Sequence, residues 1–135
     1  MNPSPYHAAL NALFARTTGV WKLGLERVEA LLGELGDPHR RLRVLHVAGT
    51  NGKGSTCALL EGALRARGLR VGIYTSPHLV DFRERFIVDG RVLPDEVIAE
   101  WLARWTPTVE RLGATFFEAT TAMGFLPRRK PKNRW

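Results

Sequence analysis

Apolar residues recur along this chain at two spacings, and each spacing predicts one type of secondary structure. Spacings of three and four residues predict amphipathic helices, at Pro5 to Phe14, Leu25 to Leu35, Cys57 to Arg67, Asp95 to Leu112 and Phe116 to Leu126. Short, mostly apolar runs at Leu42 to Ala48 and Leu69 to Thr75 predict two buried parallel strands. The stretch from Thr17 to Leu23 is expected to be a connector.

Residues that break regular structure mark where these elements end. Gly36, Asp37 and Pro38 stop the helix that precedes them, and Gly68 stands where a helix C-cap is expected. Asp89-Gly90 separates two short runs, at Arg85 to Val88 and Arg91 to Leu93, and this pattern predicts a hairpin.

The order of the elements predicts the fold class. The two apolar strands and the helix between them form one βαβ unit, which is expected to be right-handed. At 135 residues the chain has room for one modest domain. We therefore expect an α/β protein with an incomplete P-loop-type parallel sheet flanked by helices. Trp101 and Trp105, four residues apart on one helix, are expected in the core.

Composition excludes several classes of protein. With 44% hydrophobic and 24% charged residues, the chain is not disordered over its whole length. Cys57 is the single cysteine, which excludes an internal disulfide and a cysteine-based zinc site and fits a reducing cytosol. The N-terminus lacks the pattern of a signal peptide, and no apolar run approaches the ~20 residues of a membrane span. We therefore expect a cytoplasmic protein.

The net charge of +7 is mostly a property of the last nine residues. Pro127 to Trp135 holds five of the 20 basic residues and none of the 13 acidic ones, so that 15 basic residues against 13 acidic ones leave +2 for the rest. The charge therefore says little about what the domain binds.

The segment Gly49 to Thr56 (Gly-Thr-Asn-Gly-Lys-Gly-Ser-Thr) has the composition of a phosphate-binding loop between a strand and a helix. Glycines let backbone N–H groups point inward, and the following helix adds its positive N-terminal end. Lys53 is expected to contact the β- and γ-phosphates, and the hydroxyl of Ser55 or Thr56 to reach a magnesium ion. Its spacing departs from the common G-x-x-x-x-G-K-[ST] pattern, because two residues separate Gly49 from Gly52 and Gly54 follows Lys53.

This variant loop, preceded by Leu45 to Ala48, resembles the Mur ligase superfamily, and within it folylpolyglutamate synthase and dihydrofolate synthase. Three other stretches resemble the same family in the same order. They are Leu23 to Arg27, Gly72 to Leu79 with Arg83-Glu84-Arg85 after it, and Thr115 to Glu118. The resemblance covers about residues 5–126.

The resemblance implies an ATP-dependent ligase of folate metabolism. In such an enzyme ATP phosphorylates the carboxylate of dihydropteroate or of a (tetrahydro)folate, and the amine of L-glutamate attacks the acyl phosphate. Carried over to this chain, Thr50, Asn51, Gly52, Lys53, Gly54 and Ser55 hold ATP, with Lys53 as the catalytic residue. Ser76 and Ser55 are the magnesium ligands, and Thr115, Phe116, Phe117 and Leu23 hold the pterin end. We expect a monomer that acts on these small molecules and not on a membrane or nucleic acid.

Residues 1–126 are expected to be a partial ATP-binding domain and residues 127–135 a disordered, aberrant basic tail. The family continues with a Glu-Val-Gly-x-Gly-Gly motif, a histidine ligand, a modified lysine and a C-terminal domain, none of which occurs in this sequence. The familiar pattern stops between about Gly124 and Pro127, inside an apolar helix. We therefore interpret the tail as frameshifted sequence, and we expect the chain to be inactive alone.

Three alternatives remain open at this stage. In the first the chain is another Mur-type amide ligase, and in the second it is a non-catalytic nucleotide-binding fragment. In the third it is a module whose basic tail binds nucleic acid. The last draws on the five basic residues and Trp135 of the tail. Confinement of that charge to the point where the pattern breaks argues against it.

Overall fold

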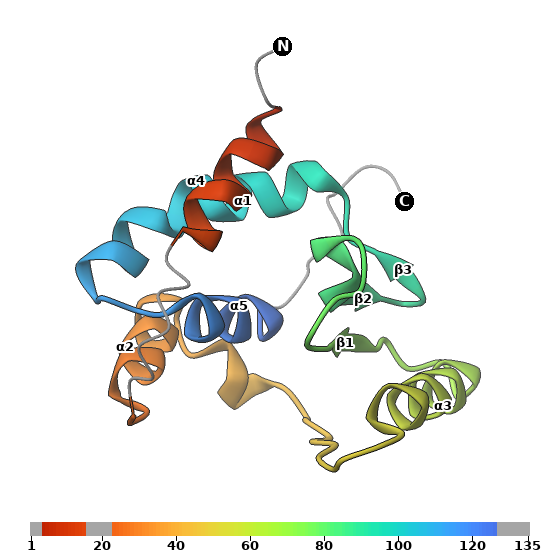
Figure 1. Ribbon diagram of the computed structural model, residues 1–135. Helices are drawn as coiled ribbons and strands as arrows, with labels where there is room; N and C mark the ends of the chain where they lie inside the picture. The colour runs from red at the N-terminus through yellow and green to blue at the C-terminus, as the bar shows by residue number, and fades with distance from the viewer. Residues whose placement is uncertain (1–3, 16–22, 127–135) are drawn as a thin grey trace. The chain divides into compact units, whose positions relative to one another are not determined.

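The computed structural model describes residues 4–15 and 23–126 (Figure 1). The helices are α1 (Pro5–Phe14), α2 (Glu26–Glu34), α3 (Lys53–Ala66), α4 (Asp95–Arg111) and α5 (Phe116–Gly124), with 3-10 turns η1 (Pro38–Arg41) and η2 (Phe82–Arg85). The strands are β1 (Gly72–Tyr74), β2 (Phe86–Val88) and β3 (Arg91–Val92). The chain divides into two compact units, Met1–Ala12 with Val44–Arg104 and Leu13–Arg43 with Trp105–Trp135.

The first unit is built on a three-stranded antiparallel sheet in the order β1-β2-β3. Ile73 pairs with Ile87, and Val88 pairs with Arg91 across the hairpin. Asp89 and Gly90 turn the hairpin with φ angles of 48° and 79°, the left-handed values that a two-residue type I′ turn requires. The predicted hairpin is therefore confirmed.

Aromatic side chains pack beneath this sheet. Phe86 of β2 is fully buried, with the ring of Tyr74 stacked on it at 5.6 Å and the ring of Phe82 edge-on at 5.4 Å between centroids. Trp101 of α4 is buried in the core as the sequence predicted, whereas Trp105, predicted there as well, is only partly buried. These rings make a rigid base for the loop that joins β1 to η2.

Helix α3 starts at Lys53, four residues before the predicted Cys57, and ends at the predicted cap. Gly68 has a φ of 77°, its N–H bonds the carbonyl of Arg65, and the N–H of Leu69 bonds that of Leu64. This pair of bonds is the Schellman motif, which glycine permits at no steric cost. α3 packs against β1, yet none of its side chains is buried.

The strand predicted at Leu42 to Ala48 is not formed. Within the described chain this segment belongs to no sheet, and its Val44 and Leu45 side chains are 56% and 65% exposed. The second predicted strand shrinks to β1, whose partner β2 is antiparallel, so the parallel pair is wrong as well. A strand needs a neighbour for its backbone groups, and no described segment pairs with residues 42–48. The α/β class, with helices flanking a sheet, is confirmed.

The second unit is helical. α2 buries Leu31 and Leu32, and it lies side by side with α5, which buries Ala119, Ala122 and Met123 (Figure 1). Helix α4 runs through Pro107 and supplies residues to both units. The predicted bounds of α1, α2, α4 and α5 agree with the structure to within two residues at each end.

Two sequence predictions lie outside the described residues, the connector from residue 17 to 22 and the basic tail at 127–135. In the part of the chain that is described, no helix has both the length and the apolar character to cross a bilayer.

Candidate functional site: the turn before α3 and the loop after β1

The turn that leads into α3 has the geometry of a phosphate-binding terminus. Gly52 is the N-cap with a φ of 75°, a left-handed conformation that favours glycine, and its carbonyl accepts the first helical bond from Thr56 at 2.9 Å. The N–H groups ahead of that bond have no intrahelical partner and lie at the positive end of the helix dipole. A Cβ built on Gly52 or Gly54 meets no heavy atom within 4 Å, so the space beside the turn is open.

Lys53 folds back over this turn. Its ammonium donates to the carbonyl oxygens of Gly49 at 2.6 Å and Thr50 at 3.1 Å, so two of its three N–H donors bind the loop. The side chain is exposed. The same bonds therefore hold the turn closed and keep the charge at the head of α3.

Lys53 and Ser76 line the same pocket although 23 positions separate them in the sequence. The pocket has a volume of about 400 Å³, within the range of small-molecule sites. Its walls are Val47, Lys53, Gly54, Cys57, Tyr74, Thr75, Ser76, Pro77, Leu79 and Glu84. Thr50, Asn51, Gly52 and Ser55 are not in its wall. Of the seven residues predicted to bind ATP and magnesium, three thus line one pocket, and the other four lie in the adjoining turn and the first turn of α3.

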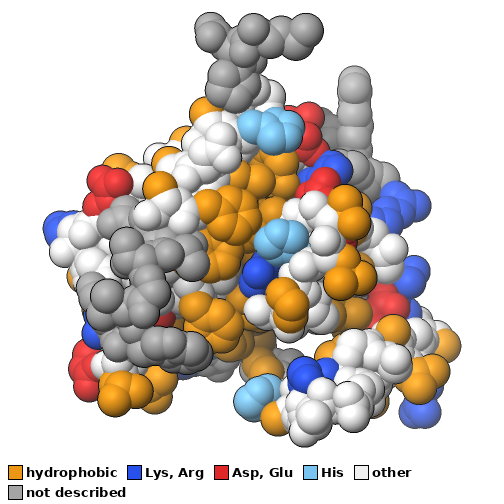
Figure 2. All heavy atoms as spheres, in the orientation of Figure 1, with side chains coloured by type: hydrophobic (Ala, Val, Ile, Leu, Met, Phe, Trp, Pro, Cys, Tyr) orange, Lys and Arg blue, Asp and Glu red, His pale blue; other side chains and the backbone are white. Residues whose placement is uncertain are grey.

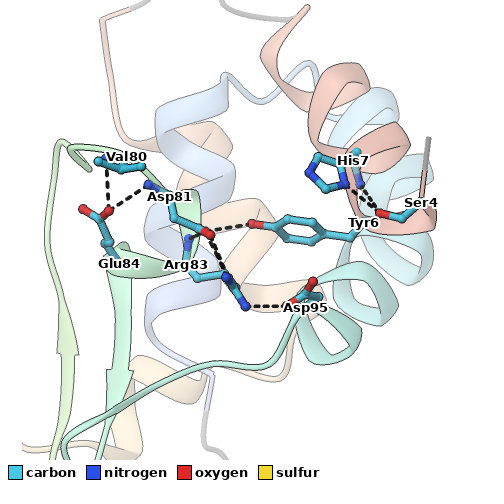
Figure 3. A network of polar contacts seen from close by, with 8 residues as sticks. All are labelled: Ser4, Tyr6, His7, Val80, Asp81, Arg83, Glu84 and Asp95. Atoms are coloured by element: carbon cyan, nitrogen blue, oxygen red, sulfur yellow. Dashed lines mark hydrogen bonds and ion pairs between the residues drawn. The ribbon is translucent and has the colours of Figure 1, made fainter.

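The loop after β1 is held by a carboxylate. Glu84 accepts hydrogen bonds from the backbone N–H groups of Leu79 at 2.8 Å, Val80 at 3.0 Å and Asp81 at 2.7 Å (Figure 3 draws the last two). These backbone bonds lower the pKa of Glu84, because they favour its charged form. The Ser76-Pro77 peptide in this loop is cis.

A second network fixes the other end of the loop. Arg83 bonds Asp81 through Nε and Nη2, at 3.0 and 2.7 Å to Oδ2, and also reaches Asp95 at the start of α4 (Figure 3). The hydroxyl of Tyr6 in α1 donates to Asp81 at 3.2 Å. Hydrogen bonds from Arg83 are the main cause that lowers the pKa of Asp81 to about 2, and burial is the main cause that raises that of Tyr6 to about 12.

Glu84, Arg85 and Cys57 were not assigned a role from the sequence. Arg83-Glu84-Arg85 was noted only as part of a family resemblance, because three charged residues in a row are ordinary on a solvated surface. Their alternation in the 3-10 turn sends Glu84 to the loop backbone and buries Arg85. The local sequence pattern does not predict these two roles.

The residues predicted to hold the pterin end belong to the other compact unit. Thr115 is the N-cap of α5, where its hydroxyl accepts the N–H of Glu118 and Glu118 accepts the N–H of Thr115, a capping box. Phe116 stacks on Phe14 at 5.0 Å. Phe117 and Leu23 are 60% and 91% exposed. Thr115 and Phe116 therefore have structural roles that account for them, whereas Phe117 and Leu23 present apolar surface.

Metal ligands are sparse in this site. Among residues 4–15 and 23–126 no group of three or more His, Cys, Asp and Glu side chains is placed to hold an ion. The pocket offers the hydroxyls of Thr75 and Ser76 as hard oxygen ligands, whereas both carboxylate oxygens of Glu84 already accept backbone N–H groups. Such a set fits Mg²⁺ that arrives with phosphate oxygens and keeps several waters.

The chain is similar in sequence and in fold to proteins of known function. No family model matches the chain. A probable bifunctional folylpolyglutamate synthase/dihydropteroate synthase of Haloferax volcanii is 45% identical over 123 residues, 87% of this chain and 15% of the relative. The dihydrofolate synthase/folylpolyglutamate synthase of Bacillus subtilis is 43% identical over 114 residues, 78% of this chain and 26% of the relative.

Solved structures of folylpolyglutamate synthases are similar to this chain as well. Folylpolyglutamate synthase of Thermotoga maritima matches with a TM-score of 0.78 at 36% identity, over 89% of this chain and 30% of that one. A bifunctional folylpolyglutamate synthase/dihydrofolate synthase with Mn, AMPPNP and L-glutamate bound matches with a TM-score of 0.74 at 38% identity. The match covers 90% of this chain and 29% of that one. An FPGS–AMPPCP–folate complex matches with a TM-score of 0.78 at 33% identity, over 93% of this chain and 32% of that one.

The fold and the glycine–lysine turn at the head of α3 define an α/β protein of the phosphate-loop type. Over most of its length the chain is similar to folylpolyglutamate and dihydrofolate synthases. It spans about a third or less of the length of the relatives that it matches.

Proposed function

We propose that this chain is the ATP-binding part of a ligase that joins L-glutamate to dihydropteroate or a (tetrahydro)folate. The observation that carries the proposal is the pocket shared by Lys53 and Ser76 at the head of α3. Relatives of the same fold support it, since one holds AMPPNP, Mn and L-glutamate and another holds AMPPCP and folate. Residues 1–126 act as a partial ATP-binding domain, which needs further parts for turnover.

In this proposal the turn from Thr50 to Ser55 binds the phosphates of ATP. Backbone N–H groups ahead of Thr56 donate to phosphate oxygens. The ammonium of Lys53 exchanges the carbonyls of Gly49 and Thr50 for the β- and γ-phosphates, where its charge stabilises the transferring group. The hydroxyls of Ser76 and Ser55 would hold Mg²⁺, which would neutralise charge on the phosphates.

The chemistry then proceeds in two balanced steps. A carboxylate oxygen of the pterin-linked substrate attacks the γ-phosphorus of ATP, which gives an acyl phosphate and ADP. The amine of L-glutamate attacks the acyl carbon, loses a proton and expels inorganic phosphate, which leaves an amide. Phe117 and Leu23 offer exposed apolar surface for the pterin end. Thr115 caps the start of α5, the helix that carries Phe117, and Phe116 stacks on Phe14.

We propose that this protein acts in the cytoplasm, as a monomer, and that small molecules are its partners in place of nucleic acid. Sedimentation of the purified chain and binding to a random single strand at low and high salt test the last two.

The test of the function is titration of the full chain with ATP, with and without Mg²⁺. Lys53→Ala removes the charge at the head of α3, and Arg67→Ala removes the same charge at its other end as the matched control. We expect Lys53→Ala to weaken binding about tenfold or more, because a charge-assisted contact is worth about 1.5 to 3 kcal/mol. Arg67→Ala is expected to stay within about twofold. Absence of ATP binding in the wild type, or equal losses in both variants, contradicts the proposal.

A further inference from the structure

Arg85 carries a buried positive charge beside the pocket. Arg85 is the last residue of the 3-10 turn η2 and is only 5% exposed. A buried guanidinium is costly unless its N–H groups are bonded. Arg85 donates from Nε to Nδ1 of His78 at 2.8 Å and from Nη1 to Oγ of Ser76 at 3.1 Å. The guanidinium carbon lies 5.7 Å from the centre of the Phe82 ring.

These two bonds tie together side chains on either side of Pro77. The guanidinium is planar, so its Nε and Nη1 donors have a fixed separation and direction. Both His78 and Ser76 must therefore orient their acceptor atoms toward one plane. The ring of His78 also lies edge-on to Phe82, with centroids 5.9 Å apart.

The backbone of the same loop is held by other groups. Glu84 takes the N–H groups of Leu79, Val80 and Asp81, and the backbone N–H of Thr75 bonds the carbonyl of Arg85 at 3.1 Å. The guanidinium is not needed for these bonds. What it adds is the orientation of two side chains, one of which lines the pocket.

We propose that Arg85 is a positioning residue that orients the Ser76 hydroxyl toward the pocket and fixes His78 as a hydrogen-bond acceptor. Because Ser76 accepts from Arg85, its own O–H hydrogen and its other lone pair are directed away from the guanidinium. The consequence for metal-dependent ATP binding rests on the proposed function, whereas the orientation of His78 does not. A lysine at this position has one donor atom and cannot form the fork.

The first experiment reads the orientation without any nucleotide. Long-range ¹H–¹⁵N NMR of the full chain at pH 8 reports which ring nitrogen of His78 carries the proton. We expect one neutral tautomer, protonated at Nε2, in the wild type and a mixture of both in Arg85→Lys and Arg85→Gln. Arg83→Lys is the matched control, since its partners are Asp81 and Asp95 and not the pocket side chains. An unchanged tautomer in both Arg85 variants overturns the proposal.

Protection of the Leu79 to Asp81 amides from hydrogen exchange checks that each variant is folded. If the Arg85 variants do not fold, the Nε–H proton of Arg85 is followed in the wild type and in His78→Ala. Slow exchange in the wild type and fast exchange in His78→Ala support the bond, and fast exchange in both overturns it.

The second experiment measures ATP binding with and without Mg²⁺. We expect Arg85→Lys to reduce about tenfold the factor by which Mg²⁺ strengthens ATP binding, because loss of a residue that orients a metal ligand has an effect of this size. Metal-free binding is expected within about twofold, and Ser76→Ala is expected to abolish any effect of Arg85→Lys. Equal loss with and without Mg²⁺, or full additivity with Ser76→Ala, overturns the role. If the wild type binds no ATP the proposed function fails, and the His78 tautomer still decides the role of Arg85.

Discussion

Asp81 shows how much of the site depends on single charged side chains. It accepts hydrogen bonds from Arg83 and Tyr6, and it is joined through Arg83 to Asp95 at the head of α4. These contacts come from a loop, two helices and a 3-10 turn. One carboxylate therefore holds the end of the pocket loop against the elements around it (Figure 3).

We predict that Asp81 makes the protein sensitive to acid. Its pKa falls from 3.8 to about 2 in the folded state, so its stabilisation is complete above pH 4 and is lost as the pH falls toward 2. About a third of the side chain is exposed, and we therefore expect a loss of about 1 kcal/mol after allowance for solvent screening. Urea unfolding across this range measures it.

Asp81→Asn is expected to remove that loss. Asp37→Asn is the matched control, because the Asp37 carboxylate faces only Arg40 among the ion pairs of the described residues, at 3.9 Å. Asparagine also tolerates the left-handed backbone of Asp37. The same acid dependence in wild type and Asp81→Asn shows that the network does not stabilise the loop.

At the scale of the element, a capping box fixes where helix α5 begins. The capping box of Thr115 and Glu118 satisfies two N–H groups that the helix leaves without a partner. Glu118 also pairs with Arg27, with Nη2 and Oε1 3.0 Å apart, which joins α5 to α2. Hydrogen bonds from Thr115 and Arg27 lower the pKa of Glu118 although its burial, the largest single effect, acts in the opposite direction.

We predict that Thr115→Ala lowers the free energy of unfolding by about 1 kcal/mol, the usual cost of a lost N-cap. Thr115→Ser keeps the hydroxyl and is expected to restore most of it. Thermal unfolding followed by circular dichroism measures both variants. A Thr115→Ala protein as stable as the wild type leaves substrate contact as the better account of Thr115.

At the scale of the whole molecule, apolar surface is unevenly covered. α2 and α5 bury their apolar stripes in one unit, whereas α3 leaves Leu59 76% exposed. Figure 2 shows hydrophobic side chains at the lower right, where α3 lies in Figure 1.

We predict that substitutions of two leucines change the stability by very different amounts. Leu59→Gln is expected to change stability by about 0.5 kcal/mol or less and to reduce binding of a hydrophobic dye, because its side chain already lies in water. Leu31→Ala is expected to cost about 2 to 5 kcal/mol, since Leu31 is fully buried. A loss above about 1 kcal/mol in Leu59→Gln shows that the face of α3 is covered after all.

The sequence determined those features that local physics decides. The left-handed turn at Asp89-Gly90, the cap at Gly68 and the bounds of α1, α2, α4 and α5 depend on a few neighbouring residues, and the structure agrees with each. The left-handed conformation of Gly52 is local as well, whereas α3 begins four residues before the predicted Cys57. That the turn binds phosphate stays a prediction. Its assignment to ATP came from resemblance to a family and remains a proposal.

Only the tertiary structure decided what depends on distant partners. Residues 42–48 have the composition of a buried strand, yet no described strand lies beside them to accept their backbone hydrogen bonds. Lys53 and Ser76 meet in one pocket because α3 packs on β1. Arg85 bonds the side chains of Ser76 and His78 because folding buries its charge beside them. A strand, a pocket and a buried charge each require groups far apart in sequence, which local pattern does not specify.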